Sequence, residues 1–290
     1  MSRSRPTRPA ATALPLLLLL LALAPAAAGA QQPSRVPDVH YVPSPPEVVD
    51  AMLGVARVGR GDVLYDLGSG DGRIPIAAAK RFGTRGVGID IDPALVRESR
   101  RNAARAGVAK LVRFREADLF RTDLREATVV TLYLMPHLNL RLRPKLFREL
   151  RPGARVASHA FDMGDWHADS TLDVEGRTVY HWVVPANVGG RWTLAVPGGG
   201  RYTLQLHQKF QRVMAEVERD GARATVEDAR VRADSVSLAL LVPRTPGAAP
   251  DTLRLRGRVA GGLMTGDGWR ATREGPAPPL GQEGESPFRP

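Results

Sequence analysis

Short apolar strands alternate with amphipathic helices between residues 62 and 185, and this alternation constrains the fold more than any other feature. Strands are predicted at 63–67, 86–90, 111–115, 128–134 and 155–159. Strands joined by helices of this length form a parallel sheet with right-handed crossovers. Two further runs, 172–174 and 178–184, predict a terminal antiparallel hairpin. The predicted fold class is therefore α/β, with a seven-stranded sheet that is parallel except for this hairpin.

Local signals place the helices between these strands. Ser44-Pro45-Pro46-Glu47 matches a capping box, which predicts that Ser44 caps a helix running to about residue 57. Asp92-Pro93 predicts the cap and first-turn proline of a helix that ends at Ala106. A short helix ending at Leu150 is expected to carry Pro144 in its first turn, where proline is tolerated.

The period changes after Pro185, where apolar residues alternate with polar or small ones. The alternation covers 192–196, 202–206, 236–240 and 253–259. It predicts a small antiparallel β domain over 190–273, with the first domain ending at 187. Arg254, Arg256 and Arg258 are expected on the solvent face of one strand. Since no aromatic residue is interleaved with them for base stacking, this row argues against a nucleic-acid partner.

Both ends of the chain have the composition of segments outside a folded domain. Three arginines precede the apolar run 16–24, and Ala28-Gly29-Ala30 follows it, which predicts a signal peptide over 1–30 and an exported, periplasmic or secreted, protein. An uncleaved membrane anchor is the alternative, although the run is shorter than the roughly 20 residues of a span. Residues 31–43 are predicted to be a linker, and 274–290 a disordered tail. The net charge of +11 favours binding to anionic envelope surfaces, so association with a membrane surface is a further expectation.

The glycine-rich turn between the first strand and the helix that follows it is the candidate binding motif of this chain. It reads Asp66-Leu67-Gly68-Ser69-Gly70-Asp71-Gly72. Gly68 and Gly70 allow a tight turn and a close approach of the backbone to a ligand, and Gly72 permits close packing of strand and helix. Backbone N–H groups at the helix start then face the ligand.

Two further carboxylates follow neighbouring strands. Asp90 ends the second strand, where a carboxylate can accept both hydroxyls of a ribose. Asp118 follows the third strand and can accept a hydrogen bond from an exocyclic amine. A nicotinamide cofactor prefers the spacing Gly-x-Gly-x-x-Gly. The acid two places before Gly68 suits a cofactor that carries an ammonium group better than one that carries a pyrophosphate.

This ordered set resembles the class I S-adenosylmethionine-dependent methyltransferases over about 44–187. The resemblance implies a Rossmann-like methyltransferase sheet and S-adenosyl-L-methionine as cofactor. It implies that Asp66 and the turn hold the methionine part, that Asp90 binds the ribose, and that Asp118 contacts adenine N6. The cofactor-binding residues so predicted are Tyr41, Asp66, Gly68, Ser69, Gly70, Gly72, Asp90, Ile91, Asp118 and Leu119.

A narrower group is also similar. The string 66–74, the segment Tyr41-Val42-Pro43 and the string 150–156 look like the lysine methyltransferases typified by the mitochondrial ATP-synthase c-subunit enzyme. In that group the upstream segment folds over the cofactor, which makes Tyr41 a candidate lid residue.

The acceptor is expected at the carboxyl ends of the fourth and fifth strands. Tyr133, His159 and Asp162 are the candidate catalytic residues there, and for each a purely structural role is the alternative. The polar-Pro-Pro-aromatic motif of nucleobase methyltransferases is absent. The chain has no cysteine and its six histidines lack ligand spacing, so no metal site is expected.

The predicted function is transfer of a methyl group to an unidentified acceptor, with protein lysine as the favoured candidate. The alternative is a noncatalytic envelope binding module on a methyltransferase fold. The oligomeric state is left open by these patterns.

Overall fold

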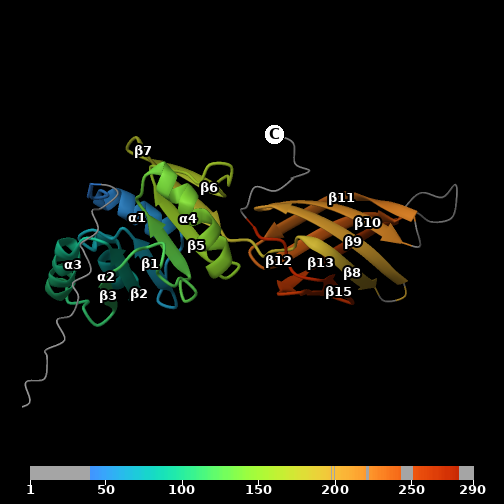
Figure 1. Ribbon diagram of the computed structural model, residues 1–290, viewed down its shortest axis with the longest axis horizontal. Coiled ribbons are helices and arrows are strands. Elements are labelled where there is room, and N and C mark those ends of the chain that lie inside the picture. The colour runs from blue at the N-terminus through green and yellow to red at the C-terminus, as the bar shows by residue number, and fades with distance from the viewer. Residues whose placement is uncertain (1–39, 197, 199, 220–221, 243–250, 281–290) are drawn as a thin grey trace, which may run out of the picture. The chain divides into compact units, whose positions relative to one another are not determined.

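The computed structural model describes residues 40–280, apart from 197, 199, 220–221 and 243–250 (Figure 1). Its first domain holds a seven-stranded sheet in the order β3-β2-β1-β4-β5-β7-β6. The strands are β1 Val63–Leu67, β2 Arg85–Asp90, β3 Val112–Glu116, β4 Val129–Leu132, β5 Arg155–His159, β6 Ser170–Val174 and β7 Arg177–Val183. β1 to β5 pair in parallel, and β7 is antiparallel to both neighbours. The predicted fold class is confirmed.

The sheet reverses its strand order at β1, which pairs with β2 on one side and β4 on the other. A ligand of an open α/β sheet binds in the crevice at such a reversal, outside the carboxyl ends of the strands. The topology therefore places a binding site beyond Leu67, Asp90 and Leu132.

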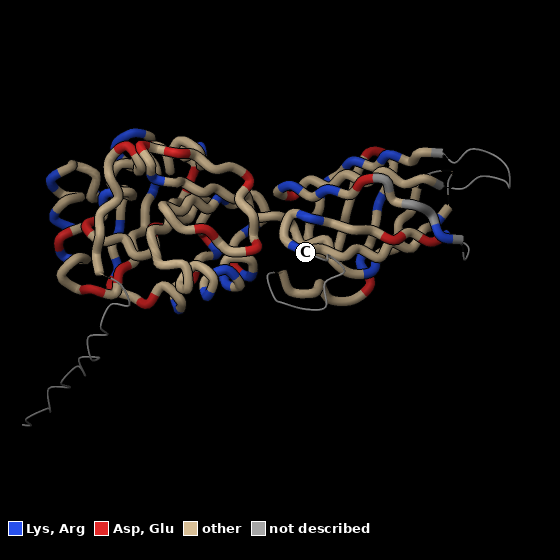
Figure 2. The backbone as a smooth tube through the Cα atoms, turned by 90° about the horizontal axis from the view of Figure 1, so that it is seen from above, with Lys and Arg blue, Asp and Glu red and all other residues tan. Residues whose placement is uncertain are grey.

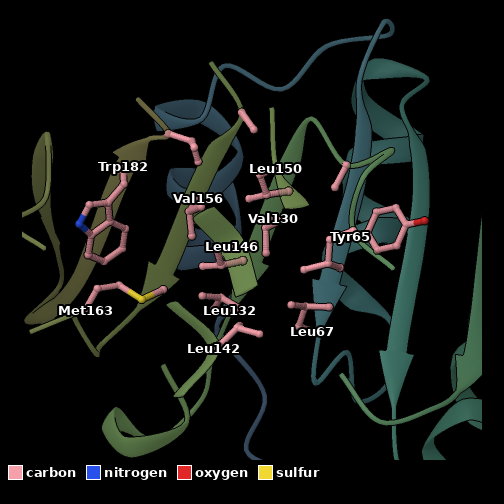
Figure 3. Packing of buried hydrophobic residues seen from close by; sticks show 14 of the residues in the cluster. Tyr65, Leu67, Val130, Leu132, Leu142, Leu146, Leu150, Val156, Met163 and Trp182 are labelled. Carbon is pink, nitrogen blue, oxygen red and sulfur yellow. The ribbon is translucent and has the colours of Figure 1, made fainter. Parts of the chain in front are cut away.

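Both faces of the sheet are covered by helices. These are α1 Pro46–Val55, α2 Arg73–Phe82, α3 Pro93–Arg105 and α4 Pro136–Glu149. Leu64 on β1 and Val129 on β4 pack in one cluster with α1 and α2. Their chain neighbours point to the opposite face, where Leu142 and Leu146 of α4 cover Leu67, Val130 and Leu132 (Figure 3). Because β1 is buried on both faces, its carboxylate, Asp66, is held in a fixed position.

Two local predictions about the helices are wrong. Ser44 does not cap α1, whose N-cap is Pro45, because the Ser44 hydroxyl is hydrogen-bonded to the Nδ1 atom of His159. Pro144 lies inside α4 rather than in its first turn, since Pro136 occupies the helix start. Proline lacks the N–H that would bond to the fourth residue before it, and that residue, Leu140, lies on the exposed face of the helix.

The second domain is a closed antiparallel barrel. Its strands are β8 Gly190–Val196, β9 Gly200–Lys209, β10 Arg212–Arg219, β11 Ala222–Arg232, β12 Ser235–Val242, β13 Asp251–Ala260, β14 Leu263–Gly266 and β15 Trp269–Glu274. Trp192, Leu204 and Met264 are fully buried inside it. Arg254, Arg256 and Arg258 are exposed while Leu255 is buried, as predicted. Figure 2 shows Lys and Arg distributed along these strands.

The predicted signal peptide, residues 31–39 of the predicted linker and residues 281–290 of the predicted tail lie outside the described residues. Within the described part of the tail, the Pro278 carbonyl accepts a hydrogen bond from Asn187 at 2.6 Å. Within the described ranges, no helix has both the length and the apolar character that a membrane span requires.

Candidate active site

A cavity of about 580 Å³ lies at the carboxyl ends of β1, β2 and β4, where the topology predicts a ligand. Most of the predicted cofactor-binding residues line it: Tyr41, Asp66, Gly68, Ser69, Asp90, Ile91, Asp118 and Leu119. Residues far apart in the sequence are thus brought to one cavity. The role of each toward the cofactor stays a prediction.

Gly70 and Gly72 support the cavity without lining it. Gly70 has φ +51°, and a Cβ atom there would overlap the ring of Tyr41, so the ring packs directly on this glycine. Gly72 has φ +81°, and its Cβ would lie 2.6 Å from the ring of Phe114. Both positions combine a left-handed backbone with a close neighbour, and glycine alone meets both demands.

The Asp90 carboxylate is held by backbone N–H groups on either side. Its Oδ2 accepts from Gly70 at 2.7 Å, and its Oδ1 accepts from Asp92 at 2.9 Å. Because a carboxylate oxygen can accept two hydrogen bonds, each oxygen keeps capacity for a ribose hydroxyl. Asp118 is fixed similarly, with Oδ1 accepting from the Phe120 N–H at 2.8 Å.

Asp66 is the most strongly perturbed acid of the cavity. It is 3% exposed, and its Oδ1 accepts a hydrogen bond from the Thr131 hydroxyl at 2.7 Å. Burial raises the pKa of Asp66 to about 7, and the negative charges of Asp90 and Asp71 also act to raise it. The Ser69 Oγ is buried and has no hydrogen-bond partner among the described residues, and it lies close to Gly88 of β2. A buried acid whose charged form is disfavoured by burial and by neighbouring carboxylates fits the ammonium group at the amino-acid end of S-adenosylmethionine.

Arg73 ties the segment 41–44 to the glycine turn. Its Nη1 donates to the Ser44 carbonyl at 2.9 Å, and its Nη2 contacts the Tyr41 hydroxyl at 3.4 Å and the Asp71 carboxylate at 2.7 Å. Sequence reasoning assigned Arg73 no role, although it stands in the string used for the resemblance. The same reasoning missed Phe120 and Arg141, which also line the cavity. The Arg141 guanidinium lies 3.9 Å from the centre of the Phe120 ring.

Two of the three candidate catalytic residues are brought together. The rings of Tyr133 and His159 lie 3.9 Å apart, and Tyr133 also lines the cofactor cavity. Asp162 lines neither this cavity nor the one beside His159. It is exposed, and its Oδ1 accepts a hydrogen bond from Gly164 at 3.0 Å, which stabilises a turn.

The fold and cavity define an S-adenosylmethionine-dependent methyltransferase, and the comparisons agree. Residues 66–170 match the model of the ANTKMT methyltransferase domain. A protein-lysine N-methyltransferase from Saccharolobus islandicus is 43% identical over 52% of this chain and 97% of its own length. The human lysine N-methyltransferase of the ATP-synthase c-subunit is 38% identical over 44% of this chain and 54% of its own length.

A solved structure is also similar. It is described as an RNA methyltransferase from Salinibacter ruber in complex with S-adenosyl-L-homocysteine, and it is 62% identical over 49% of this chain and 93% of that chain, with a TM-score of 0.49. The chain spans nearly all of the Saccharolobus relative but about half of the human one. It belongs to the same family of methyltransferases as the Saccharolobus protein, and its cofactor is S-adenosylmethionine.

Cofactor affinity should fall at acidic pH because of Asp66. The pKa of about 7 applies before a cation binds beside the carboxylate, and the bound cation lowers that pKa. Binding therefore releases a proton, and affinity should rise from about pH 6 to pH 8, by at most about tenfold per pH unit. Calorimetric titrations in buffers of different ionisation enthalpy measure the number of protons that are released when the cofactor binds. A pH-independent affinity, or a slope unchanged in Asp66→Asn, would exclude this role.

Proposed function

We propose that the chain transfers methyl groups to lysine side chains of proteins. The observation that carries the proposal is the Saccharolobus relative, a protein-lysine N-methyltransferase that is matched over nearly its whole length. The site geometry supports it, since Tyr133 stands where the cofactor cavity meets a second cavity beside His159. An acceptor side chain can approach from there.

Methyl transfer depends mainly on alignment and on exclusion of water. The bound cofactor supplies an electrophilic methyl group on a sulfonium. In this chain Asp90 and Asp118 orient the nucleoside, and Asp66 balances the positive charge. Tyr41, seated on Gly70, covers the amino-acid end.

Labelling separates the acceptor classes directly. The full chain is incubated with methyl-labelled cofactor, a bacterial protein extract and total RNA. We expect protease-sensitive, ribonuclease-resistant label that appears as methyl-lysine after acid hydrolysis, and much less label with Asp90→Ala at a limiting cofactor concentration. Label in RNA, or in protein residues other than lysine, would contradict the proposal.

We further propose that the protein is exported. The support is the order of three arginines, an apolar run and small residues within 1–30. The exposed arginines of β13 favour anionic surfaces in that compartment. A reporter fused after residue 30 tests export, and a reporter active only in the cytoplasm would refute it.

A further inference from the structure

A second cavity adjoins the cofactor cavity. Its volume is about 440 Å³, and Val42, Pro43 and Tyr133 line both cavities. The remaining wall comes from the end of β5 and the start of β7, including His159 and Arg177. The two spaces therefore meet at Tyr133, on the side of the sheet edge where an acceptor must reach the methyl group.

His159 is the buried polar group of this second cavity. It is 3% exposed, its Nδ1 lies 2.9 Å from Ser44 Oγ, and its ring packs on Tyr133. Among the described residues, its Nε2 has no hydrogen-bond partner. The imidazole is thus fixed on one side and available on the other.

The backbone after His159 is strained in a way that holds this arrangement. Ala160 has φ +65°, which is unfavourable for a residue with a Cβ atom. Its N–H donates to the Thr178 carbonyl at 2.7 Å, and the next N–H, of Phe161, turns back to the His159 carbonyl at 2.8 Å. Such strain persists where the surrounding structure imposes it, commonly at functional sites.

The electrostatics of the second cavity disfavour positive charge. Burial lowers the pKa of His159, and the Arg177 guanidinium on β7 lowers it further. Tyr133 is the titratable group that packs on the ring, and Ser44 contributes a neutral hydroxyl. A lysine ammonium entering this space meets the same guanidinium, whose positive charge favours loss of the lysine proton.

We propose that the second cavity admits the acceptor lysine and that Nε2 of His159 takes a proton from its ammonium group. This inference rests on the proposed function. In this proposal the proton in the Ser44 Oγ–His159 Nδ1 hydrogen bond is assigned to Nδ1, which leaves the Nε2 lone pair free to act as base.

The steps balance without any further reactant. One N–H bond of the ammonium breaks, the proton passes to Nε2, and the electron pair stays on the lysine nitrogen. The nitrogen then bonds to the methyl carbon while the carbon–sulfur bond breaks, and that electron pair stays on sulfur. The imidazolium, disfavoured by burial and Arg177, releases its proton to solvent.

Substitution His159→Gln should reduce the initial rate of methyl-lysine formation about 100-fold or more at neutral pH, as expected for loss of a general base. The rate is measured on a fixed, limiting amount of protein extract, where it is proportional to kcat/KM. The affinity for the cofactor should stay within about twofold of wild type. The ratio of wild-type to variant rate should fall about tenfold per pH unit toward pH 10. The reason is that the variant reacts only with lysine that is already neutral in solution, and this fraction rises about tenfold per pH unit. A merely structural role for His159 would give a loss that does not depend on pH.

His181 offers a matched control. It is also a buried histidine with a serine partner, Ser170 Oγ at 3.3 Å from Nδ1, but it lines neither cavity. His181→Gln should leave kcat/KM and its pH profile unchanged. Ser44→Ala should give an intermediate loss, since Nδ1 loses the partner that selects the tautomer.

A binding measurement keeps the inference separate from the proposed function. The full chain with S-adenosylhomocysteine is titrated with n-butylamine, and the imidazole nitrogen resonances are followed by NMR. We expect Nε2 of His159 to shift and the His181 signals to stay in place. An unchanged His159 signal at saturating amine, or equal activity of His159→Gln and wild type, overturns the inference alone. Absence of methyl-lysine with wild type overturns the proposed function and the inference with it.

Discussion

Asp90→Ala should weaken S-adenosylmethionine binding by about 100-fold or more. The predicted role of this carboxylate is to accept two ribose hydroxyls, and each hydrogen bond to a charged group contributes about 1.5–3 kcal/mol. Loss of about 3 kcal/mol corresponds to about two orders of magnitude in Kd. The substitution also frees the N–H groups of Gly70 and Asp92, which now donate to the carboxylate. Calorimetric titration of the full chain measures the effect.

Two further variants make this result specific. Asp90→Asn keeps the side-chain shape and one acceptor oxygen, so it should show an intermediate loss. Asp123→Ala removes an exposed carboxylate, paired with Arg125, away from the cavity, and should bind like wild type. If Asp90→Ala binds the cofactor with unchanged affinity, the ribose contact is wrong.

Gly72→Ala should destabilise the first domain by about 3 kcal/mol. A left-handed backbone costs a residue with a Cβ about 1–2 kcal/mol, and forcing an extra methyl group into a packed core costs about 1–3 kcal/mol. Both apply, since Gly72 has φ +81° and a Cβ would lie 2.6 Å from the Phe114 ring and 2.8 Å from Ser99. Hydrogen exchange of the amides in β1 and β2 reports on this domain apart from the barrel.

Gly107 separates the two causes. It has φ +71°, but no atom lies within 4 Å of the position of its Cβ. Gly107→Ala should therefore lose only the backbone part, about 1 kcal/mol. Equal effects of the two substitutions would show that the packing of Gly72 on Phe114 contributes nothing.

Features that depend on neighbours in the sequence were predicted well. The expected bounds of the first and fifth strands coincide with β1 and β5, and the cap by Asp92 is present, its Oδ1 accepting from Ala94 at 2.7 Å. The strand-end acids Asp66, Asp90 and Asp118 line one cavity because parallel strands end at one edge of the sheet. The order of strands, turns and acidic residues along the sequence is therefore sufficient to predict these features.

The misplaced Pro144 reflects a helix that begins at Pro136, earlier than expected, whereas the other features that sequence reasoning missed arise from contacts between distant residues. Ser44 follows the rules of a cap, yet its hydroxyl binds a histidine 115 residues away. Closure of the barrel depends on the pairing of β8 with β15, which no local pattern specifies. The contact of Tyr133 with His159 joins neighbouring strand ends, and the roles of Arg73 and Arg141 depend on the folded positions of other segments.

A crystal structure of the full chain with S-adenosylhomocysteine would test the assigned cofactor site most directly. We expect ribose hydroxyls on the Asp90 carboxylate, adenine beside Asp118 and Leu119, and the sulfur facing Tyr133. A nucleoside bound elsewhere, or a ribose that does not contact Asp90, would contradict this assignment.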